Sequence, residues 1–287
     1  MRILVCTKAD LPSLIAMNRL LPALAGHEVE LLLTERTRPA ERSAPELATL
    51  KFLERDLPLT MLFPILEQEG RTKNRLRTFR ELARDLTIPM ASIDRINDGD
   101  GFGRAQAFEP DLVISSRFSL VFRKAMLELP RHGILNLHPG PLPGYGGLFA
   151  IFQQMLAGCP EIGITLHLVD AGIDTGPVVT IRQMPIQAGR SMMWHVLRAY
   201  HEGVEAILDA VAHLDRENAL VVSAQDPGQM RYFRLPDSLQ FTAFAKAGLS
   251  LYDLEEYARD LEQFFGLPRS RIDRLIERCP PIPAAVT

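Results

Sequence analysis

Short apolar runs alternate with amphipathic segments from the start of the chain. The first run is 2–6, and a segment with helical periodicity follows from Leu11, with Asp10 in a position to cap the helix and Pro12 in its first turn. A second apolar run occupies 29–33. The order strand, helix, strand is typical of a parallel sheet with helices packed on its faces.

The same alternation continues to about residue 214. Further strands are expected at 88–92, 111–115, 133–138, 163–170 and 178–181. Helices are expected within 45–86 and at 123–129, 149–157 and 191–214, the last of them capped by Ser191. We expect the strand at 163–170 to lie at a sheet edge. We interpret the glycines of 99–103 as a turn, because they do not follow a strand as a dinucleotide-binding loop would.

The chain beyond residue 214 has a different pattern. An extended segment at 232–236 is followed by three short amphipathic helices, which we expect at 239–248, 251–265 and 269–279. The sequence therefore predicts two parts. Residues 1–214 should form a Rossmann-like α/β domain, with a mostly parallel sheet flanked by helices, and residues 215–287 a mainly helical C-terminal extension.

Composition and charge narrow the classes of function. The chain has 287 residues, of which 47% are hydrophobic and 23% charged, as in ordinary globular proteins. A net charge of -3 disfavours a protein that grips nucleic acid by its phosphates, because such proteins are usually basic. No run reaches the roughly 18 apolar residues of a membrane span, and the first run is too short for a signal peptide. We expect a cytoplasmic protein with no membrane partner.

The cysteines do not indicate a disulfide framework or a zinc site. Cys6, Cys159 and Cys279 are odd in number and widely spaced. No group of His, Cys, Asp or Glu residues has the spacing of metal ligands, so we expect no metal. The three thiols are expected to pack as small hydrophobic groups.

A loop of unusual composition follows the strand at 133–138. Residues 139–147 hold three prolines and four glycines, which exclude a helix or a central strand. A second tight loop, 171–177, contains two glycines and one proline. Loops at the carboxyl ends of strands are where α/β folds bind ligands, so both loops are candidate binding segments.

Three polar residues beside these loops could carry chemistry. Asn136 and His138 lie two apart on one strand, so their side chains share a face, and Asp174 lies in the second loop. An amide N–H can stabilise an oxyanion, and an imidazole can exchange protons near neutral pH. A carboxylate can favour the protonated form of that imidazole, or it can take a proton from an amine. The alternative is structural: a turn-forming Asn, a core His and a turn Asp.

The two loops together resemble a known signature. Residues 136–139 read Asn-Leu-His-Pro, Leu142-Pro143 follows, and 145–147 read Tyr-Gly-Gly. Residues 163–167 read Gly-Ile-Thr-Leu-His, and 169–177 read Val-Asp-Ala-Gly-Ile-Asp-Thr-Gly-Pro. This pair of motifs resembles that of the 10-formyltetrahydrofolate-dependent formyltransferases. The family includes glycinamide ribonucleotide, methionyl-tRNA and amino-sugar enzymes, and the resemblance is strongest over 108–182.

The resemblance implies roles for individual residues. Asn136, His138 and Asp174 match the family's catalytic residues, with 10-formyltetrahydrofolate as the formyl donor. The residues that match its folate site are Arg117, Phe118, Ser119, Leu120, Val169, Asp170, Ala171, Gly172 and Ile173. The residues expected to contact the acceptor are Pro139, Gly140, Tyr145 and Gly146. His167 belongs to the motif, and we expect its role to be mainly structural.

Some positions depart from the family pattern. The family often has Ser-Leu-Leu-Pro after His-Pro, where this chain has 140–143 as Gly-Pro-Leu-Pro, and an Arg where this chain has Gly146. Both changes would alter contacts to the acceptor rather than the catalytic residues.

The acceptor is expected to be an amine on a small or carrier-bound molecule. Glycinamide ribonucleotide enzymes hold a phosphate on a glycine-rich loop after the first strand, whereas 7–12 contains no glycine. The tRNA enzymes carry a C-terminal β-barrel, whereas the tail of this chain is predicted helical. We therefore expect no tRNA and favour a nucleotide-linked amino sugar over a hydroxylated ornithine or an aminoacyl group. The oligomeric state is left open, and a homodimer is one arrangement considered.

Two other classes of function remain open. In a formyltetrahydrofolate hydrolase, water would replace the amine; that family has a further N-terminal domain, for which we expect no room before Met1. A non-catalytic folate-binding protein is the second class, and it would not need the three catalytic residues.

Basic residues are clustered between positions 71 and 80. The members of this cluster are Arg71, Lys73, Arg75, Arg77 and Arg80. They are interpreted either as a solvated helix face or as a site for a phosphate or for the glutamate tail of folate.

Overall fold

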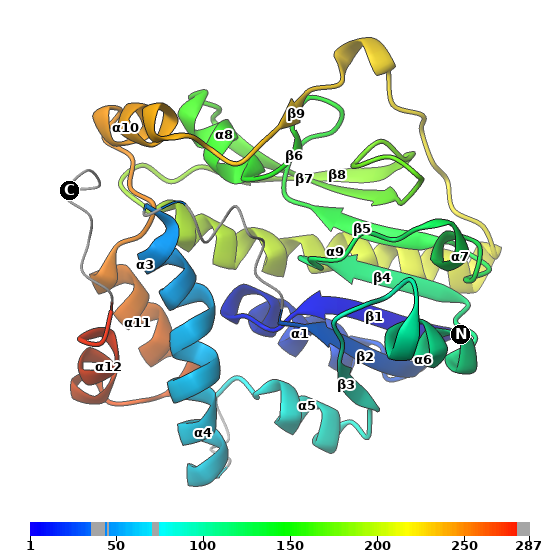
Figure 1. The fold of residues 1–287 in the computed structure, drawn as a ribbon, viewed down its shortest axis with the longest axis horizontal. Coiled ribbons are helices and arrows are strands. Elements are labelled where there is room, and N and C mark those ends of the chain that lie inside the picture. The colour runs from blue at the N-terminus through cyan, green and yellow to red at the C-terminus, as the bar shows by residue number, and fades with distance from the viewer. Residues whose placement is uncertain (36–43, 45, 71–74, 280–287) are drawn as a thin grey trace.

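A seven-stranded sheet lies at the centre of the computed structural model, which describes residues 1–35, 44, 46–70 and 75–279 (Figure 1). The strand order is β3-β2-β1-β4-β5-β7-β8; β1 to β5 run parallel, while β7 and β8 are antiparallel to their neighbours. The strands are β1 (Arg2–Lys8), β2 (Glu28–Thr34), β3 (Met90–Ser92), β4 (Leu112–Ser116), β5 (Ile134–His138), β7 (Glu161–Leu168) and β8 (Val178–Pro185). A separate two-stranded sheet pairs β6 (Gly146–Gly147) with β9 (Tyr232–Phe233). The expected Rossmann-like fold class is confirmed.

Helices cover both faces of the sheet. Those of the first part are α1 (Leu11–Ala23), α3 (Leu47–Lys51), η1 (Phe52–Asp56), η2 (Pro58–Leu62), α4 (Phe63–Glu69), α5 (Phe79–Asp85), α6 (Gly99–Phe108), α7 (Lys124–Leu127), α8 (Ala150–Leu156) and α9 (Met192–Glu217). Those of the C-terminal part are η3 (Pro227–Gln229), α10 (Ser238–Lys246), α11 (Leu254–Phe265) and α12 (Arg269–Ile276). The expected caps form: Asp10 accepts from the Ser13 backbone at 2.9 Å, and Ser191 from that of Trp194 at 3.2 Å.

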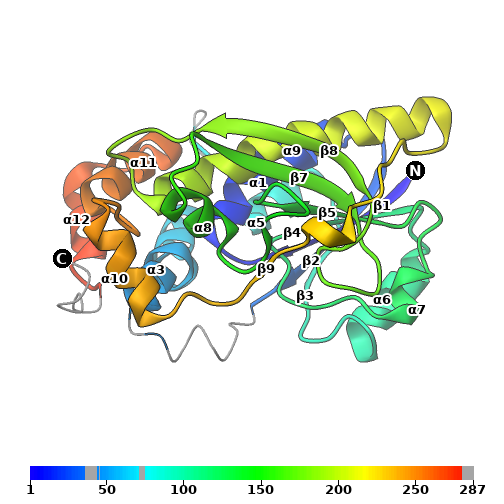
Figure 2. The ribbon, with the colours of Figure 1, turned by 90° about the horizontal axis from the view of Figure 1, so that it is seen from above.

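Alternation along β1 divides the apolar side chains between two cores. Ile3 and Val5 belong to the larger core, which includes residues of α1 and α9, whereas Leu4 and Cys6 belong to a smaller core with residues of α6 and α7. Figure 2 shows α1 and α9 on one side of the sheet and α6 and α7 on the other. Both faces of the central strands are thus buried, which explains why the strands read as nearly continuous apolar runs.

Two local expectations are wrong. Residues 99–103 are not a turn but the first half of α6, and a Cβ on Gly101 would lie 2.0 Å from the Arg95 carbonyl oxygen. Glycine at 101 therefore lets the start of α6 pack closely against the backbone of Arg95, which precedes the helix. The strand expected at an edge, β7, lies between β5 and β8, and β8 forms the edge. β7 is paired on both sides because it forms an antiparallel hairpin with β8 and also pairs with β5.

The C-terminal extension packs on the α/β part and shares its larger core. Tyr257, Leu261 and Phe265 of α11 belong to the same buried cluster as Ile3 and Val5. The expected boundary after residue 214 falls inside α9, which continues to Glu217. The division into 1–214 and 215–287 stays a prediction. No helix in the described residues is both long and apolar enough to cross a membrane.

The described members of the basic cluster are paired with carboxylates. Arg75 is bonded to Glu81 at 2.6 Å, Arg77 lies 4.0 Å from Asp85, and Arg80 lies 3.9 Å from Glu67. The Arg75 side chain is only 3% exposed, so at this position the interpretation as a solvated face is wrong. Arg71 and Lys73 lie outside the described residues.

Candidate active site

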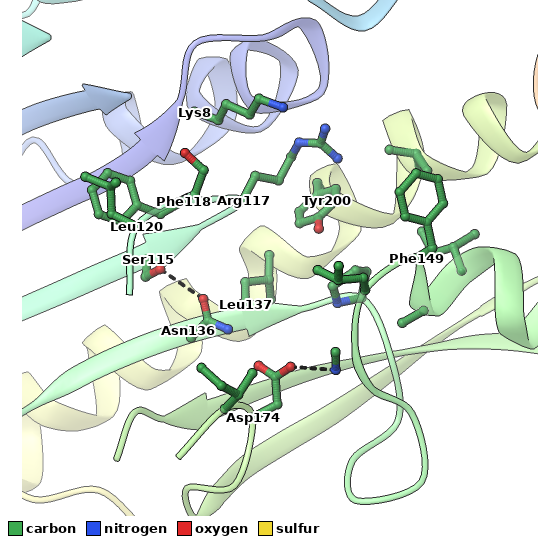
Figure 3. A pocket seen from close by; sticks show the side chains of 18 of the residues that line it. Lys8, Ser115, Arg117, Phe118, Leu120, Asn136, Leu137, Phe149, Asp174 and Tyr200 are labelled. Carbon is green, nitrogen blue, oxygen red and sulfur yellow. Dashed lines mark hydrogen bonds between the residues drawn. The ribbon is translucent and has the colours of Figure 1, made fainter. Parts of the chain in front are cut away.

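A cavity of about 290 Å³ opens at the carboxyl ends of the central strands. Lys8 ends β1, Arg117 follows β4, and Asn136 lies in β5; all three line it. In Figure 3, Phe118 and Leu120 lie on one side of the cavity and Phe149 and Tyr200 on the other, with Asn136 and Asp174 between them. The strand ends thus gather the candidate residues where parallel sheets place ligands.

The amide of Asn136 is oriented by hydrogen bonds on both of its ends. The Ser115 hydroxyl donates to Oδ1 at 2.9 Å, and Nδ2 lies 3.1 Å from Nε2 of His167. Nδ1 of His167 lies 2.8 Å from the Leu168 carbonyl oxygen, which can only accept. The His167 proton is therefore on Nδ1, and Nε2 accepts from the amide. One amide N–H is used in this way, and the second can point into the cavity.

His138 does not line the cavity. Its side chain is buried, and Nε2 lies 2.6 Å from the Tyr145 carbonyl oxygen, so Nε2 carries a proton and donates it. Nδ1 lies 3.6 Å from Oδ2 of Asp174. Asn136 and His138 share a face of β5 as expected, and the structure brings both of them to Asp174.

Asp174 occupies a constrained position in the second loop. Its φ is +56°, in the left-handed region that non-glycine residues seldom adopt. The Gly147 backbone donates to Oδ2 at 2.8 Å, and Oδ1 lies 3.7 Å from Nε2 of His167 (Figure 3 shows the first of these contacts). The carboxylate therefore faces two imidazoles and the cavity.

His167 belongs to the site more closely than the sequence suggested. It lines the cavity and pairs in register with Asn136 across β5 and β7. Burial lowers the pKa of His167; the nearby Asp174 opposes this effect, and His138 adds to it. The signal that could have found His167 is the antiparallel pairing of two consecutive motif strands, which places 136 beside 167, but neither motif alone reveals that register.

Most residues expected to bind folate do line the cavity. These are Arg117, Phe118, Ser119, Leu120, Val169, Gly172 and Ile173. The Phe118 ring stacks on Phe122 with centroids 5.4 Å apart, which makes a flat apolar wall. Asp170 and Ala171 do not line it; the Asp170 carboxylate instead accepts from Thr175 at 2.6 Å and holds the loop. Folate contacts by all nine residues stay predictions.

The side chain of Arg117 points away from Phe118 (Figure 3). Its Nη2 lies 2.8 Å from Asp10 and 3.1 Å from Glu54, and the guanidinium carbon lies 5.0 Å from the centre of the Tyr200 ring. Burial of Asp10 opposes its ionisation, but the charges of Arg117 and Lys8 outweigh burial and hold the Asp10 pKa below its ordinary range. Arg117 thus links β4, α1, η1 and α9 at this end of the cavity.

The residues expected to contact the acceptor divide between the cavity and its supporting loop. Pro139 lines the cavity, whereas Gly140, Tyr145 and Gly146 do not. A Cβ on Gly140 would lie 2.5 Å from the Tyr145 carbonyl oxygen and 2.8 Å from Nε2 of His138, so glycine allows these groups to meet. Among the described residues, no group of three His, Cys, Asp or Glu side chains is placed to hold a metal.

Residues 93–211 match the family described as formyl transferase. A methionyl-tRNA formyltransferase of Burkholderia multivorans is 28% identical over 211 residues, which cover 72% of this chain and 58% of that protein. The solved glycinamide ribonucleotide transformylase 1 of Symbiobacterium toebii has a TM-score of 0.54 at 23% identity, covering 79% of this chain and 94% of that one. WlaRD, a sugar 3N-formyl transferase, has a TM-score of 0.51 at 17% identity, covering 81% of this chain and 69% of the other. The likenesses to solved structures concern the fold.

The sequence relatives correct the expectation that tRNA plays no part. Several are methionyl-tRNA formyltransferases, and the expectation that excluded tRNA is therefore wrong. That expectation relied on a helical, weakly charged tail, whereas the family match lies within 93–211. The chain spans about half the length of the curated relatives it matches.

The matched region contains all of the side chains that meet around the candidate catalytic carboxylate. Asn136, His138, His167 and Asp174 lie within 93–211, on the strands and loops of a fold shared with solved formyltransferases. Residues 93–211, which carry these side chains, thus match the formyl transferase family.

Proposed function

We propose that this protein transfers a formyl group from 10-formyltetrahydrofolate to an amine. The observation that carries the proposal is the oriented amide of Asn136, whose Nδ2 lies 3.1 Å from His167, beside the carboxylate of Asp174 in the cavity. An amide donor and a carboxylate facing one reaction space are the two groups that formyl transfer to an amine requires.

The chemistry assigns a separate task to each group. As the neutral amine attacks the formyl carbon, a C–N bond forms and negative charge develops on the formyl oxygen, where the second N–H of Asn136 can donate. Asp174 takes the proton that the amine nitrogen loses. The bond from the formyl carbon to N10 of the folate then breaks, and that proton passes to N10. His138, whose Nδ1 lies 3.6 Å from Oδ2 of Asp174, orients that carboxylate.

The folate is proposed to lie against the apolar wall. Phe118, Leu120, Val169 and Ile173 line that side, and a flat heteroaromatic ring fits against such a surface. Ile173 is 46% exposed although it is a large apolar residue, which is consistent with a surface that a ligand covers.

Two acceptors remain as proposals, and different observations favour them. Methionyl-tRNA is favoured by the curated relatives, which are about 30% identical over part of their length. A nucleotide-linked amino sugar is favoured by the fold shared with sugar formyltransferases. Lys8, Lys51 and Arg55 line the cavity, and both acceptors carry phosphates.

The test compares both acceptors with water. Purified protein is incubated with 10-formyltetrahydrofolate and either methionyl-tRNA, dTDP-3-aminofucose or buffer alone, and tetrahydrofolate and formate are measured. Transfer gives tetrahydrofolate with a formylated acceptor and no formate. Formate release in buffer alone at the same rate would instead establish a hydrolase. Binding is checked by the increase in Tm with 5-formyltetrahydrofolate, since a ligand at a hundredfold excess over its Kd stabilises the folded state by about 2.7 kcal/mol.

A further inference from the structure

The C-terminal extension returns to the loops of the site through residues 223–233, here called the 223–233 segment. Two backbone hydrogen bonds of 2.8 Å, one in each direction, join Ser223 to Val178 at the start of β8. The chain then passes through η3 to β9, which pairs with β6 in the Pro/Gly loop. Figures 1 and 2 both show the chain crossing here from the end of α9 to α10 on the opposite side of the molecule.

The side chain of Gln225 is bonded to the loop that carries Asp174. Its Nε2 donates to the Asp174 carbonyl oxygen at 2.9 Å and to the Gly176 carbonyl oxygen at 2.6 Å. Both N–H groups of one amide therefore hold two carbonyls of the same tight loop. This matters because Asp174 has a φ of +56°, and a non-glycine residue in such a conformation costs about 1–3 kcal/mol and persists only where its surroundings hold it.

The second half of the segment holds the opposite loop. The Gly146 backbone donates to the Arg231 carbonyl oxygen at 3.0 Å, the Arg231 backbone donates to that of Pro143 at 3.0 Å, and the Tyr145 ring stacks on Phe233 with centroids 5.6 Å apart. These bonds bracket the Tyr145 carbonyl oxygen, which accepts from His138. The segment thereby fixes the group that orients the imidazole.

Gly147 joins the two halves at the carboxylate. Its backbone donates to Oδ2 of Asp174 at 2.8 Å, and a Cβ at this position would lie 2.2 Å from the Phe233 carbonyl oxygen. Only glycine lets β9 lie so close while the Gly147 N–H reaches Asp174. The 223–233 segment therefore contacts the loop of Asp174 from one side and the backbone donor to its carboxylate from the other.

From these contacts we infer that Gln225 is a positioning residue, which sets the orientation of the Asp174 carboxylate for proton transfer. The inference rests on the proposed function and gives the C-terminal extension a part in it. Gln225 does not line the cavity, so it acts through Asp174 and not on the substrate. A small displacement of a reacting group can lower turnover by about a hundredfold, whereas the folate wall, which Gln225 does not contact, should bind as before.

The test measures kcat, KM and 5-formyltetrahydrofolate affinity for Gln225→Ala, using whichever of methionyl-tRNA and dTDP-3-aminofucose the wild-type protein formylates. We expect kcat to fall by about ten- to a hundredfold, with the folate Kd changed less than about twofold. The matched control is Gln229→Ala, because Gln229 lies in the same segment, is exposed and bonds to Asp226 at 3.0 Å. If Gln225→Ala unfolds at the assay temperature, Gln225→Glu replaces it, since it keeps the shape and loses both donors.

A double mutant separates positioning from general stability. In an Asp174→Asn background, Gln225→Ala should lower kcat by less than about twofold, because two residues that act through one group are not additive. An equal loss in both backgrounds, or a Gln225→Ala variant with more than half of the wild-type kcat, would overturn the inference while leaving the proposed function intact. A wild-type protein that formylates neither acceptor would contradict the proposed function itself, and the inference with it.

Discussion

Asn136 and His167 face each other in register across β5 and β7, and the amide Nδ2 of one donates to the imidazole Nε2 of the other at 3.1 Å. The bond exists only while Nε2 is unprotonated, because a protonated nitrogen has no lone pair to accept with. Burial lowers the pKa of His167 and so favours the neutral form that the amide requires. The histidine thus orients the group proposed to bind the oxyanion.

His167→Ala should lower turnover by removing this acceptor. A net hydrogen bond contributes about 1 kcal/mol, so we expect kcat to fall roughly five- to tenfold. The effect should be smaller than that of Asn136→Ala, which removes the donor itself. Steady-state kinetics on both variants, together with their Tm, make the comparison. If His167→Ala lost only stability and kept full kcat, the orienting role would be wrong.

Thermal stability should decrease as the pH falls below about 6.5, the ordinary pKa of histidine. The pKa of His167 is lower in the folded state than in the unfolded chain, so between the two values the unfolded state binds more protons and is favoured. Above the unfolded value both states are neutral at this position, and the effect vanishes. Tm measured from pH 5 to pH 8 should therefore depend less steeply on pH in His167→Gln.

Other histidines set the background for that measurement. The pKa values of His132, His195 and His201 are also lowered, in each case chiefly by burial. Part of the slope should therefore remain in His167→Gln. An unchanged slope would mean that His167 titrates alike in both states.

Arg117→Met should destabilise the fold more than the double variant Asp10→Asn with Arg117→Met. The Asp10 side chain is fully buried and that of Arg117 is 13% exposed, so removing the arginine leaves a buried carboxylate that keeps the Ser13 backbone donor at 2.9 Å and Lys8 at 4.0 Å. Breaking such a pair from one side costs about 3–5 kcal/mol, whereas removing both charges can be nearly neutral. Urea unfolding of the two variants measures the difference.

The loss of stability at acidic pH gives a second measure of the Asp10–Arg117 pair. Because the Asp10 pKa is lowered in the folded state, its stabilising contribution is present above the ordinary value of about 3.9 and is lost as the pH falls through the folded value. The free energy of unfolding should therefore fall less steeply below this ordinary value in the double variant than in the wild type. A single variant as stable as the wild type at pH 7 would contradict the pairing.

The fold was predictable where the pattern along the chain is local. The apolar runs locate the strands, and the period of two places Asn136 and His138 on one face of β5. The pattern failed at 99–103, because glycine composition alone does not distinguish a turn from a helix whose glycine permits contact with Arg95. That contact depends on the neighbouring backbone and leaves no periodic signal.

The site was predictable as far as the two motifs extend. Its other members come from distant segments: Lys8 ends β1, Glu54 lies in η1, and Tyr200 lies in α9. Gln225 reaches the Asp174 loop from 51 residues away, through a segment with no recognisable motif. Such contacts are set by tertiary packing, which single-sequence patterns do not encode.

Glu256→Ala should loosen the start of α9. The Glu256 carboxylate accepts from the Ser191 backbone at 3.1 Å and from Arg190 at 3.2 Å, so α11 supplies a negative charge at the N-terminus of α9. Loss of such a cap costs about 0.5–2 kcal/mol. The matched control is Glu255→Ala, whose side chain is 57% exposed and pairs with Arg269. Denaturant unfolding and hydrogen exchange of α9 amides should separate the two; equal effects would contradict the capping role.

Asp174→Asn should abolish most turnover while leaving the site in place. The asparagine keeps the shape of the side chain, and its oxygen can still accept from the Gly147 backbone, which donates to Asp174 at 2.8 Å. What it loses is the negative charge that takes the proton of the attacking amine and faces Nδ1 of His138. General acid–base catalysis contributes about 10²–10⁴ in rate, so kcat should fall by that factor.

Asn136→Ala should cost about 10²–10³ through loss of the oxyanion donor, and His138→Ala should also be strongly impaired. The affinity for 5-formyltetrahydrofolate should survive in all three variants, because the proposed folate wall is formed by other residues. Turnover and folate affinity are to be measured on the same purified preparations, with Tm as the check on folding.

If Asp174→Asn retained more than about a tenth of the wild-type kcat, the loss would fall below the range of acid–base catalysis. The amine proton would then have to leave to water or to the folate itself, and the role assigned to the Asp174 carboxylate would be wrong.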